Sequence, residues 1–117
     1  MKLKELINKM DLNVWHFAEG SNPDISSGFC SDMLSHVVGH AKEGQIWLTC
    51  QAHRNCIGVA SLKDIPVILL VNFSGTPDPE VLTLARQEGI SILSSKQNGF
   101  ELSGILFQLF FPKGDEG

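Results

Sequence analysis

The sequence predicts one α/β domain of three layers, in which a largely parallel sheet of about five strands is covered by helices on both faces. Three observations lead to this prediction. The 117 residues, 43% of them apolar, have the size and composition of a single globular domain. Segments with helix and strand patterns alternate along the chain. The continuous apolar run 67–71 is typical of a strand that is buried on both faces of a parallel sheet.

Five segments have apolar residues at helical spacing, and cap residues are expected to fix several of their ends. Ser31-Asp32 is expected to cap the second helix, which Gly44 would end. Asp78 and Pro79 are typical of the start of the fourth helix, and Gly89 is typical of its end. The helices are therefore predicted over 2–10, 31–44, 56–63, 78–89 and 100–109.

Four segments have strand patterns. Apolar and polar residues alternate in the first, and the others are nearly continuous runs of apolar residues. They are predicted over 12–17, 46–50, 66–71 and 90–93. Because helices separate these strands, right-handed crossovers and a parallel arrangement are expected. Residues 1–112 are expected to form the domain and residues 113–117 a disordered tail.

Charge and cysteine content argue against several classes of protein. Thirteen acidic and nine basic residues give a net charge of −4, which offers no footprint for nucleic acid or for an anionic membrane. The longest apolar run, 67–71, is far shorter than the roughly 18 residues of a membrane-spanning helix. Three cysteines, Cys30, Cys50 and Cys56, form a poor disulfide framework and indicate reduced thiols. The protein is therefore expected in the cytoplasm.

Polar segments follow three of the predicted strands, at 49–55, 72–76 and 94–98. Ligands of such sheets bind at the carboxyl ends of the strands, and the helix that follows each segment could hold an anion with its first amides. Asp32 can be read as a helix cap, the favoured interpretation, or as a functional acid. The alternative interpretation is that these loops are polar only because they are exposed to solvent, and it stays open. The predicted ligand site comprises Ser26, Ser27, Asp32, Thr49, Gln51, His53, Asn55 and Asn72.

No complete catalytic set and no phosphate-binding loop motif is found in the sequence. Cys50, His53 and Cys56 stand three apart, a spacing that matches no zinc pattern. His36 and His40 could chelate a metal from one helix face but are more often solvated. Cys50 lies beside His53, which could favour a thiolate, but no orienting carboxylate is recognisable. We therefore predict no catalytic residue, no cofactor and no metal site.

Several segments resemble a known family. The run DISSGFCSDMLS at 24–35 resembles the segment that names the DRTGG domain, in which Ile-Thr-Gly-Gly-aromatic is followed by Ser-Asp-Leu-Leu-Ser. AKEGQIWLT at 41–49, TCQAHRN at 49–55 and EGISILS at 88–94 are similar to further segments of that family. The match covers nearly the whole chain. Ser26 and Ser27 replace the Thr and the first Gly of the naming motif, and Ser27 loses the easy access of glycine to positive φ.

The resemblance implies an α/β/α domain like the N-terminal domain of the kinase/phosphorylase that acts on HPr. Such domains also occur in phosphate acetyltransferases and in CBS-domain pyrophosphatases, where they accompany adenine-nucleotide regulation. A non-catalytic regulatory domain is therefore expected, which binds an adenine nucleotide or a phosphorylated metabolite and acts on a partner protein. The alternative is an accessory protein with a Cys/His metal or redox role linked to iron-only hydrogenase or iron–sulfur systems. The family also implies a homodimer, which a surplus of apolar positions at Phe107, Phe110 and Phe111 favours.

Overall fold

The centre of the fold is a five-stranded sheet in the order β1-β5-β4-β3-β2. The computed structural model describes residues 1–113, so only Lys113 of the predicted tail lies within it. Strands β2 to β5 are parallel, and β1 pairs with β5 in the antiparallel direction. The strands are β1 (Asn13–His16), β2 (Gly28–Cys30), β3 (Ile46–Thr49), β4 (Val67–Leu70) and β5 (Ser91–Ser94).

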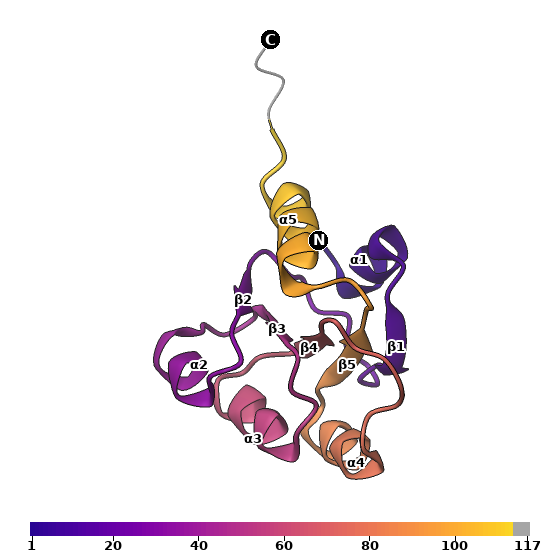
Figure 1. Ribbon diagram of the computed structural model, residues 1–117, viewed down its shortest axis with the longest axis vertical. Coiled ribbons are helices and arrows are strands. Elements are labelled where there is room, and N and C mark those ends of the chain that lie inside the picture. The colour runs from indigo at the N-terminus through magenta and orange to yellow at the C-terminus, as the bar shows by residue number, and fades with distance from the viewer. Residues whose placement is uncertain (114–117) are drawn as a thin grey trace.

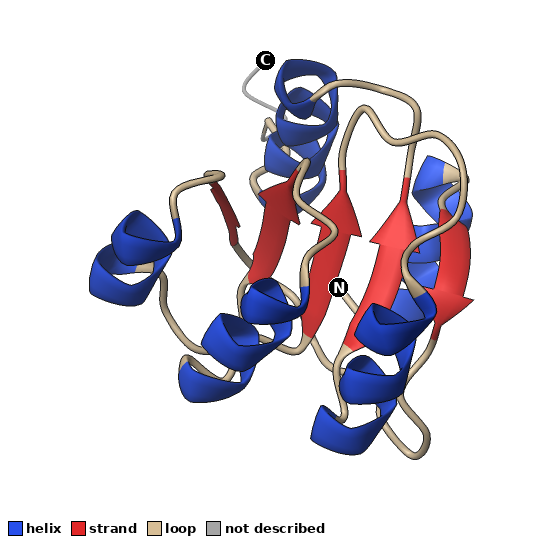
Figure 2. Cartoon of the chain, turned by 60° about the horizontal axis from the view of Figure 1, so that its bottom comes forward, coloured by secondary structure: helices blue, strands red, loops and turns tan. Residues whose placement is uncertain are grey.

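Helices cover both faces of this sheet (Figure 1). They are α1 (Leu3–Met10), α2 (Leu34–His40), α3 (Arg54–Leu62), α4 (Pro79–Glu88) and α5 (Gly99–Phe110). Helices α1 and α5 lie on one face and α2, α3 and α4 on the other, and Figure 2 shows the strands between them. The predicted three-layer α/β/α domain with a largely parallel sheet is confirmed. No helix within residues 1–113 is both long and apolar enough to cross a membrane.

Alternating side chains of the central strands build two cores. Ile46 and Leu48 of β3 join the cluster under α1 and α5, whereas Trp47 joins the cluster under α2, α3 and α4. Trp47 is fully buried, and its Nε1–H donates a 2.9 Å hydrogen bond to the Ser31 carbonyl. A tryptophan in such a place stabilises a fold by several kcal/mol, of order 3–5 on truncation to alanine. It also ties β3 to the segment that follows β2.

Strand β2 lies in a segment for which no strand was predicted. It is three residues long, too short for a pattern, and its pairing with β3 places Gly28 opposite Ile46. A Cβ at Gly28 would lie 3.1 Å from Ile46 Cγ2 and 3.2 Å from the Ile46 carbonyl oxygen. The bare glycine therefore permits the close approach of the two strands.

The prediction for the second helix, 31–44, is wrong at both ends. Helix α2 begins at Leu34 after an N-cap residue, Met33, that makes no side-chain cap bond. It ends at His40, because Ala41 is already extended (φ −68°, ψ 152°). Gly44 has a φ of +80°, but it lies in the turn that leads into β3. Asp32 does not cap the helix, because its carboxylate accepts from Thr49 and Cys50; the Ser31 hydroxyl accepts from the Met33 amide at 3.1 Å, just before the helix.

The ends of α4 and α5 follow from their caps. Asp78 accepts from the Glu80 amide at 2.9 Å, and Gly89 ends α4 in the left-handed region, as predicted. Helix α5 starts with a capping box, which was not predicted from the sequence. Asn98 Oδ1 accepts from the Glu101 amide at 2.9 Å, and Glu101 Oε1 accepts from the Asn98 amide at 3.1 Å.

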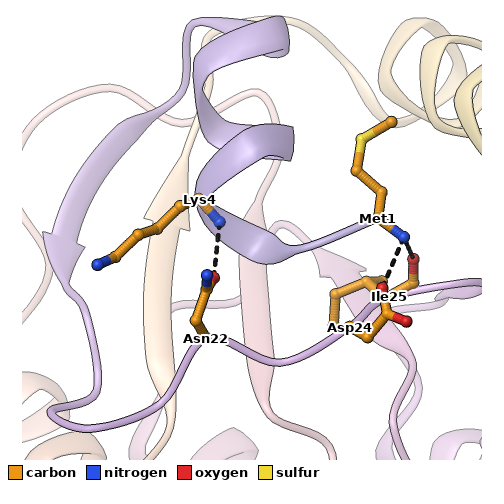
Figure 3. A network of polar contacts seen from close by, with 5 residues as sticks. All are labelled: Met1, Lys4, Asn22, Asp24 and Ile25. Carbon is orange, nitrogen blue, oxygen red and sulfur yellow. Dashed lines mark hydrogen bonds and ion pairs between the residues drawn. The ribbon is translucent and has the colours of Figure 1, made fainter.

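The amino end of the chain is fastened to the segment that precedes β2 (Figure 3). The Met1 ammonium donates to Asp24 Oδ1 at 2.7 Å and to the Ile25 carbonyl at 3.1 Å. In the first turn of α1, the Lys4 amide donates to Asn22 Oδ1 at 3.1 Å. Hydrogen bonding to this ammonium and its positive charge hold the pKa of Asp24 below its ordinary value. These contacts set the position from which β2 enters the sheet.

Candidate functional site

Asp32 joins the carboxyl ends of β2 and β3. Its Oδ1 accepts a 2.7 Å hydrogen bond from the Thr49 hydroxyl and a 2.9 Å hydrogen bond from the Cys50 amide. Thr49 is fully buried, and its Oγ1 accepts from the Gln51 amide at 3.2 Å. The Thr49 hydroxyl, followed by the Cys50 amide, lowers the pKa of Asp32. The carboxylate therefore stays ionised at neutral pH and holds the chain where it leaves β3.

The loop from β3 to α3 is fixed again at the start of the helix. The Cys56 thiol donates to the Gln51 carbonyl at 3.3 Å. His53 is the N-cap of α3, and its Nδ1 accepts from the Asn55 amide at 3.2 Å. A neutral ring that accepts at Nδ1 carries its proton on Nε2, so His53 offers an N–H donor to the solvent side.

Three predicted site residues, Gln51, His53 and Asn55, line one open hollow of about 480 Å³. Leu34 and Ala52 complete the five lining residues, none of which is acidic. The amides of Gln51 and Asn55 and the imidazole of His53 can all donate hydrogen bonds. Asp32 and Thr49 do not line the hollow but support its loop. The arrangement suits a ligand rich in oxygen acceptors.

Ser26 and Ser27 lie at the other end of the sheet. The Ser27 carbonyl accepts from the Ile46 amide at 3.1 Å, where β3 begins, and the Ser27 hydroxyl accepts from Gln45 Nε2 at 3.2 Å. Because β2 and β3 are parallel, the length of β3 separates these serines from Thr49, about 10 Å. The structure therefore does not bring the two serines to the hollow.

Asn72 lies at the carboxyl end of β4 without lining the hollow. It is exposed and left-handed (φ 50°), a conformation that asparagine tolerates better than most residues. Its amide donates to the Gln97 carbonyl at 2.7 Å. Asn72 therefore fastens the end of β4 to the loop between β5 and α5.

Two of the cysteines, Cys50 and Cys56, are poorly suited to nucleophilic chemistry. Hydrogen bonding to Asp32, together with burial, raises the pKa of the Cys50 thiol. Burial likewise raises the pKa of Cys56. Neither thiol is therefore activated as a thiolate at neutral pH. His36 and His40 lie with ring centroids 4.5 Å apart, but within residues 1–113 no group of three or more His, Cys, Asp or Glu is placed to hold a metal ion.

A second hollow, of about 210 Å³, lies between the edge strand β2 and helix α5. Its walls are mainly apolar and come from Cys30, Leu48, Leu106, Phe107 and Phe110, among others. No hollow was predicted here from the sequence. The sequence feature that could have indicated this hollow is the surplus of phenylalanines near the end of α5.

No protein-family model and no curated protein matches this chain. Solved structures do match. One of them contains the CBS and DRTGG domains of the regulatory region of Clostridium perfringens pyrophosphatase, complexed with its activator, diadenosine tetraphosphate. The TM-score is 0.69 at 13% sequence identity, and the match covers 91% of this chain and 46% of that one.

This chain thus spans about half the length of the structure it matches. At this identity the likeness shows the fold alone, and the similarity to the HPr kinase domain stays a prediction. The chain has a DRTGG-like fold, as its sequence motifs predict.

Proposed function

We propose that this chain is a non-catalytic regulatory domain of the cytoplasm that binds a small phosphorylated ligand, with an adenine nucleotide as the first candidate. The ligand would occupy the hollow lined by Gln51, His53 and Asn55. The domain would act as a homodimer on a partner protein. The single observation that supports the ligand is the set of three side-chain donors, held in place by Asp32 and Thr49, on a hollow without an acidic lining residue.

The chemistry of the hollow favours phosphate oxygens over cations. Amide and imidazole N–H groups pair with anionic oxygens, and hydrogen bonds to charged groups are stronger than neutral ones. The hollow lies at the N-terminal end of the nine-residue helix α3, where the helix dipole adds positive potential. Its volume of about 480 Å³ falls in the range of small-molecule sites.

The comparison with the pyrophosphatase supports the choice of nucleotide. That regulatory region was solved with diadenosine tetraphosphate, an activator that carries both adenine and phosphate groups. A chain with the same fold and a donor-rich hollow at the carboxyl ends of its strands is a reasonable receptor for a related ligand. The regulatory role is proposed on the same likeness.

The alternative role, in metal or redox chemistry linked to iron–sulfur systems, has less support. The raised pKa values of Cys50 and Cys56 work against metal binding as well as nucleophilic attack, because both need the thiolate. Asp32, the carboxylate beside Cys50, is engaged with Thr49 and the Cys50 amide and does not orient His53. The same observations support a domain without catalytic activity.

Titration calorimetry and thermal unfolding with ATP, ADP, AMP, diadenosine tetraphosphate and inorganic phosphate test the proposal. At 100 times its dissociation constant, a bound ligand adds about 2.7 kcal/mol to the free energy of unfolding. Gln51→Ala and Asn55→Ala should each weaken binding about 5- to 10-fold, the loss of one hydrogen bond.

Gln87→Ala on α4 and Asn8→Ala on α1 are the matched controls, since both side chains are exposed and line no part of the hollow. Their affinities should equal that of the parent chain. Absence of binding for the whole panel at millimolar concentration would refute the ligand proposal. Equal losses in site and control variants would refute the assignment to this hollow.

A further inference from the structure

Helix α5 has a second, exposed apolar face, part of which borders the hollow beside β2. Phe100, Phe107 and Phe111 are 90%, 65% and 56% exposed, whereas Leu102 and Leu106 are buried against the sheet. A spacing of seven residues puts Phe100 and Phe107 on one line along the helix, and the ring centroid of Phe111, the C-cap residue, lies 4.9 Å from that of Phe107. Figure 1 shows that α5 extends away from the sheet toward its C-terminal end.

Two small residues, Ser103 and Gly104, lie on the same line between Phe100 and Phe107. A Cβ at Gly104 would meet no atom within 4 Å, so the surface above it is open. Interaxial distances between packed helices depend on side-chain size at the contact, and small residues allow a close crossing. We call the line formed by Phe100, Ser103, Gly104, Phe107 and Phe111 the α5 stripe.

The α5 stripe is complementary to itself when two copies run antiparallel. Phe100 precedes Ser103 by three positions, and Phe107 follows Gly104 by three positions. A twofold axis between Ser103 and Gly104 therefore puts the small residues of both copies at the crossing and each Phe100 against Phe107 of the partner subunit. Such a self-complementary patch is what a twofold-symmetric interface requires.

Charge and area also suit a second copy. Glu101 is the only charged residue of α5, and interface centres are depleted of charge. The three rings leave about 400 Å² of aromatic surface in solvent, about half of the roughly 800 Å² that each partner buries in a standard interface. The apolar hollow of about 210 Å³ between β2 and Phe107 adds adjoining surface.

We infer that a second copy of this chain packs on the α5 stripe, with the two α5 helices antiparallel and crossing at Ser103 and Gly104. The inference rests on the proposed homodimer and specifies its interface. Since the aromatic stripe supplies only part of a standard interface, the two copies should form a transient dimer that exchanges with the monomer.

Sedimentation equilibrium of the full chain and of Gly104→Glu tests the interface. The substitution puts a carboxylate of each copy at the crossing, so association should weaken at least 10-fold. Glutamate is a better helix former than glycine, and the site is open, so the monomer should stay folded by circular dichroism. Gly58→Glu on α3 is the matched control, since Gly58 is also an exposed helical glycine with open space and lies on the other face of the sheet.

Disulfide cross-linking tests the direction of the helices in a background with Cys30→Ser and Cys50→Ser. Gly104→Cys should cross-link with its own copy, because two positions beside the twofold axis come within the reach of a disulfide. Phe111→Cys should not, because an antiparallel partner puts the two C-terminal ends apart. Cross-linking of Phe111→Cys without that of Gly104→Cys would overturn the antiparallel crossing.

The outcomes separate the interface from the rest of the proposed function. A dimer of the parent chain and of Gly58→Glu, with a folded monomer for Gly104→Glu, supports the inference. If Gly104→Glu is as dimeric as its parent, the interface is refuted while the homodimer stands. A parent chain that is monomeric at tens of micromolar refutes both, whereas nucleotide binding by the monomer would still support the ligand site.

Discussion

The hydroxyl of Thr49 donates a 2.7 Å hydrogen bond to the carboxylate of Asp32, which lies 17 positions earlier in the chain. The same oxygen of Asp32 accepts the Cys50 amide at 2.9 Å. One exposed carboxylate therefore joins the ends of two neighbouring parallel strands and sets the start of the loop that carries Gln51 and His53.

Replacement of Asp32 should destabilise the fold in a graded way. Asp32→Ala leaves the buried Thr49 hydroxyl without its acceptor and should lower the free energy of unfolding by about 1–2 kcal/mol in urea titrations. Asp32→Asn keeps an acceptor oxygen and should cost less. Glu43→Ala, at an exposed turn position, is the control and should change stability by less than about 0.5 kcal/mol. Equal stability of Asp32→Ala and the parent would contradict the supporting role.

The reactivity of Cys50 should depend on Asp32. Because hydrogen bonding to Asp32 raises the pKa of the Cys50 thiol, Asp32→Asn should increase its thiolate fraction and its rate of alkylation by iodoacetamide at neutral pH. Peptide mass spectrometry can follow Cys50 separately from Cys30 and Cys56. Glu43→Gln, which removes a carboxylate elsewhere, should leave the rate unchanged. A rate in the parent chain that already exceeds that of Asp32→Asn would revive the redox alternative.

His16 should give the protein a pH-dependent stability. Burial, together with the positive charge of Arg86, lowers the pKa of His16 below 6.5, and Glu19 only partly opposes this. The unfolded chain then binds the proton more tightly, so stability should be fully present above about pH 6.5 and fall as the pH decreases toward the folded pKa. Urea titrations from pH 5 to 8 should show a flatter profile for His16→Gln than for the exposed control His40→Gln. Identical slopes would show that another group is responsible.

Two glycine substitutions should have opposite signs. Gly28→Ala places a methyl group 3.1 Å from Ile46 Cγ2 and 3.2 Å from the Ile46 carbonyl oxygen, both on the paired strand. Such overpacking should cost about 1–3 kcal/mol. Gly39→Ala lies in α2, where an added Cβ meets nothing within 4 Å, and should stabilise the chain by up to about 1 kcal/mol. Thermal unfolding compares the two, and a neutral Gly28→Ala would contradict the close approach of β2 and β3.

Local patterns predict those elements whose ends depend on nearby residues. The buried run in β4 and the Asp78 and Gly89 caps of α4 need no knowledge of the rest of the chain. Strand β2 exists only through its pairing with β3, so three residues of sequence cannot reveal it. Helix α2 was misplaced because Asp32, a good cap by residue type, bonds to Thr49 instead.

The candidate site was predicted in part for a similar reason. Gln51, His53 and Asn55 share one short segment, so their gathering at one hollow follows from a single strand end. Ser27 precedes Asp32 by only five positions, but β2 runs between them and carries Asp32 to the opposite end of the sheet. Ser27 was therefore wrongly grouped with Asp32, because strand β2 between them was not predicted.

The irregular register of β1 gives the sheet two unlike edges. Between Val14 and His16 the register of the pairing with β5 shifts. The Trp15 Nε1–H donates a hydrogen bond to Ser94 Oγ at 2.8 Å. A bulged, reversed edge of this kind resists the addition of a further strand. Strand β2, at the other end of the strand order, keeps a regular register with β3 but is only three residues long. The three residues of β2 limit the hydrogen bonds that an added strand could form, so both edges resist growth of the sheet, the first by its irregular register and the second by its shortness.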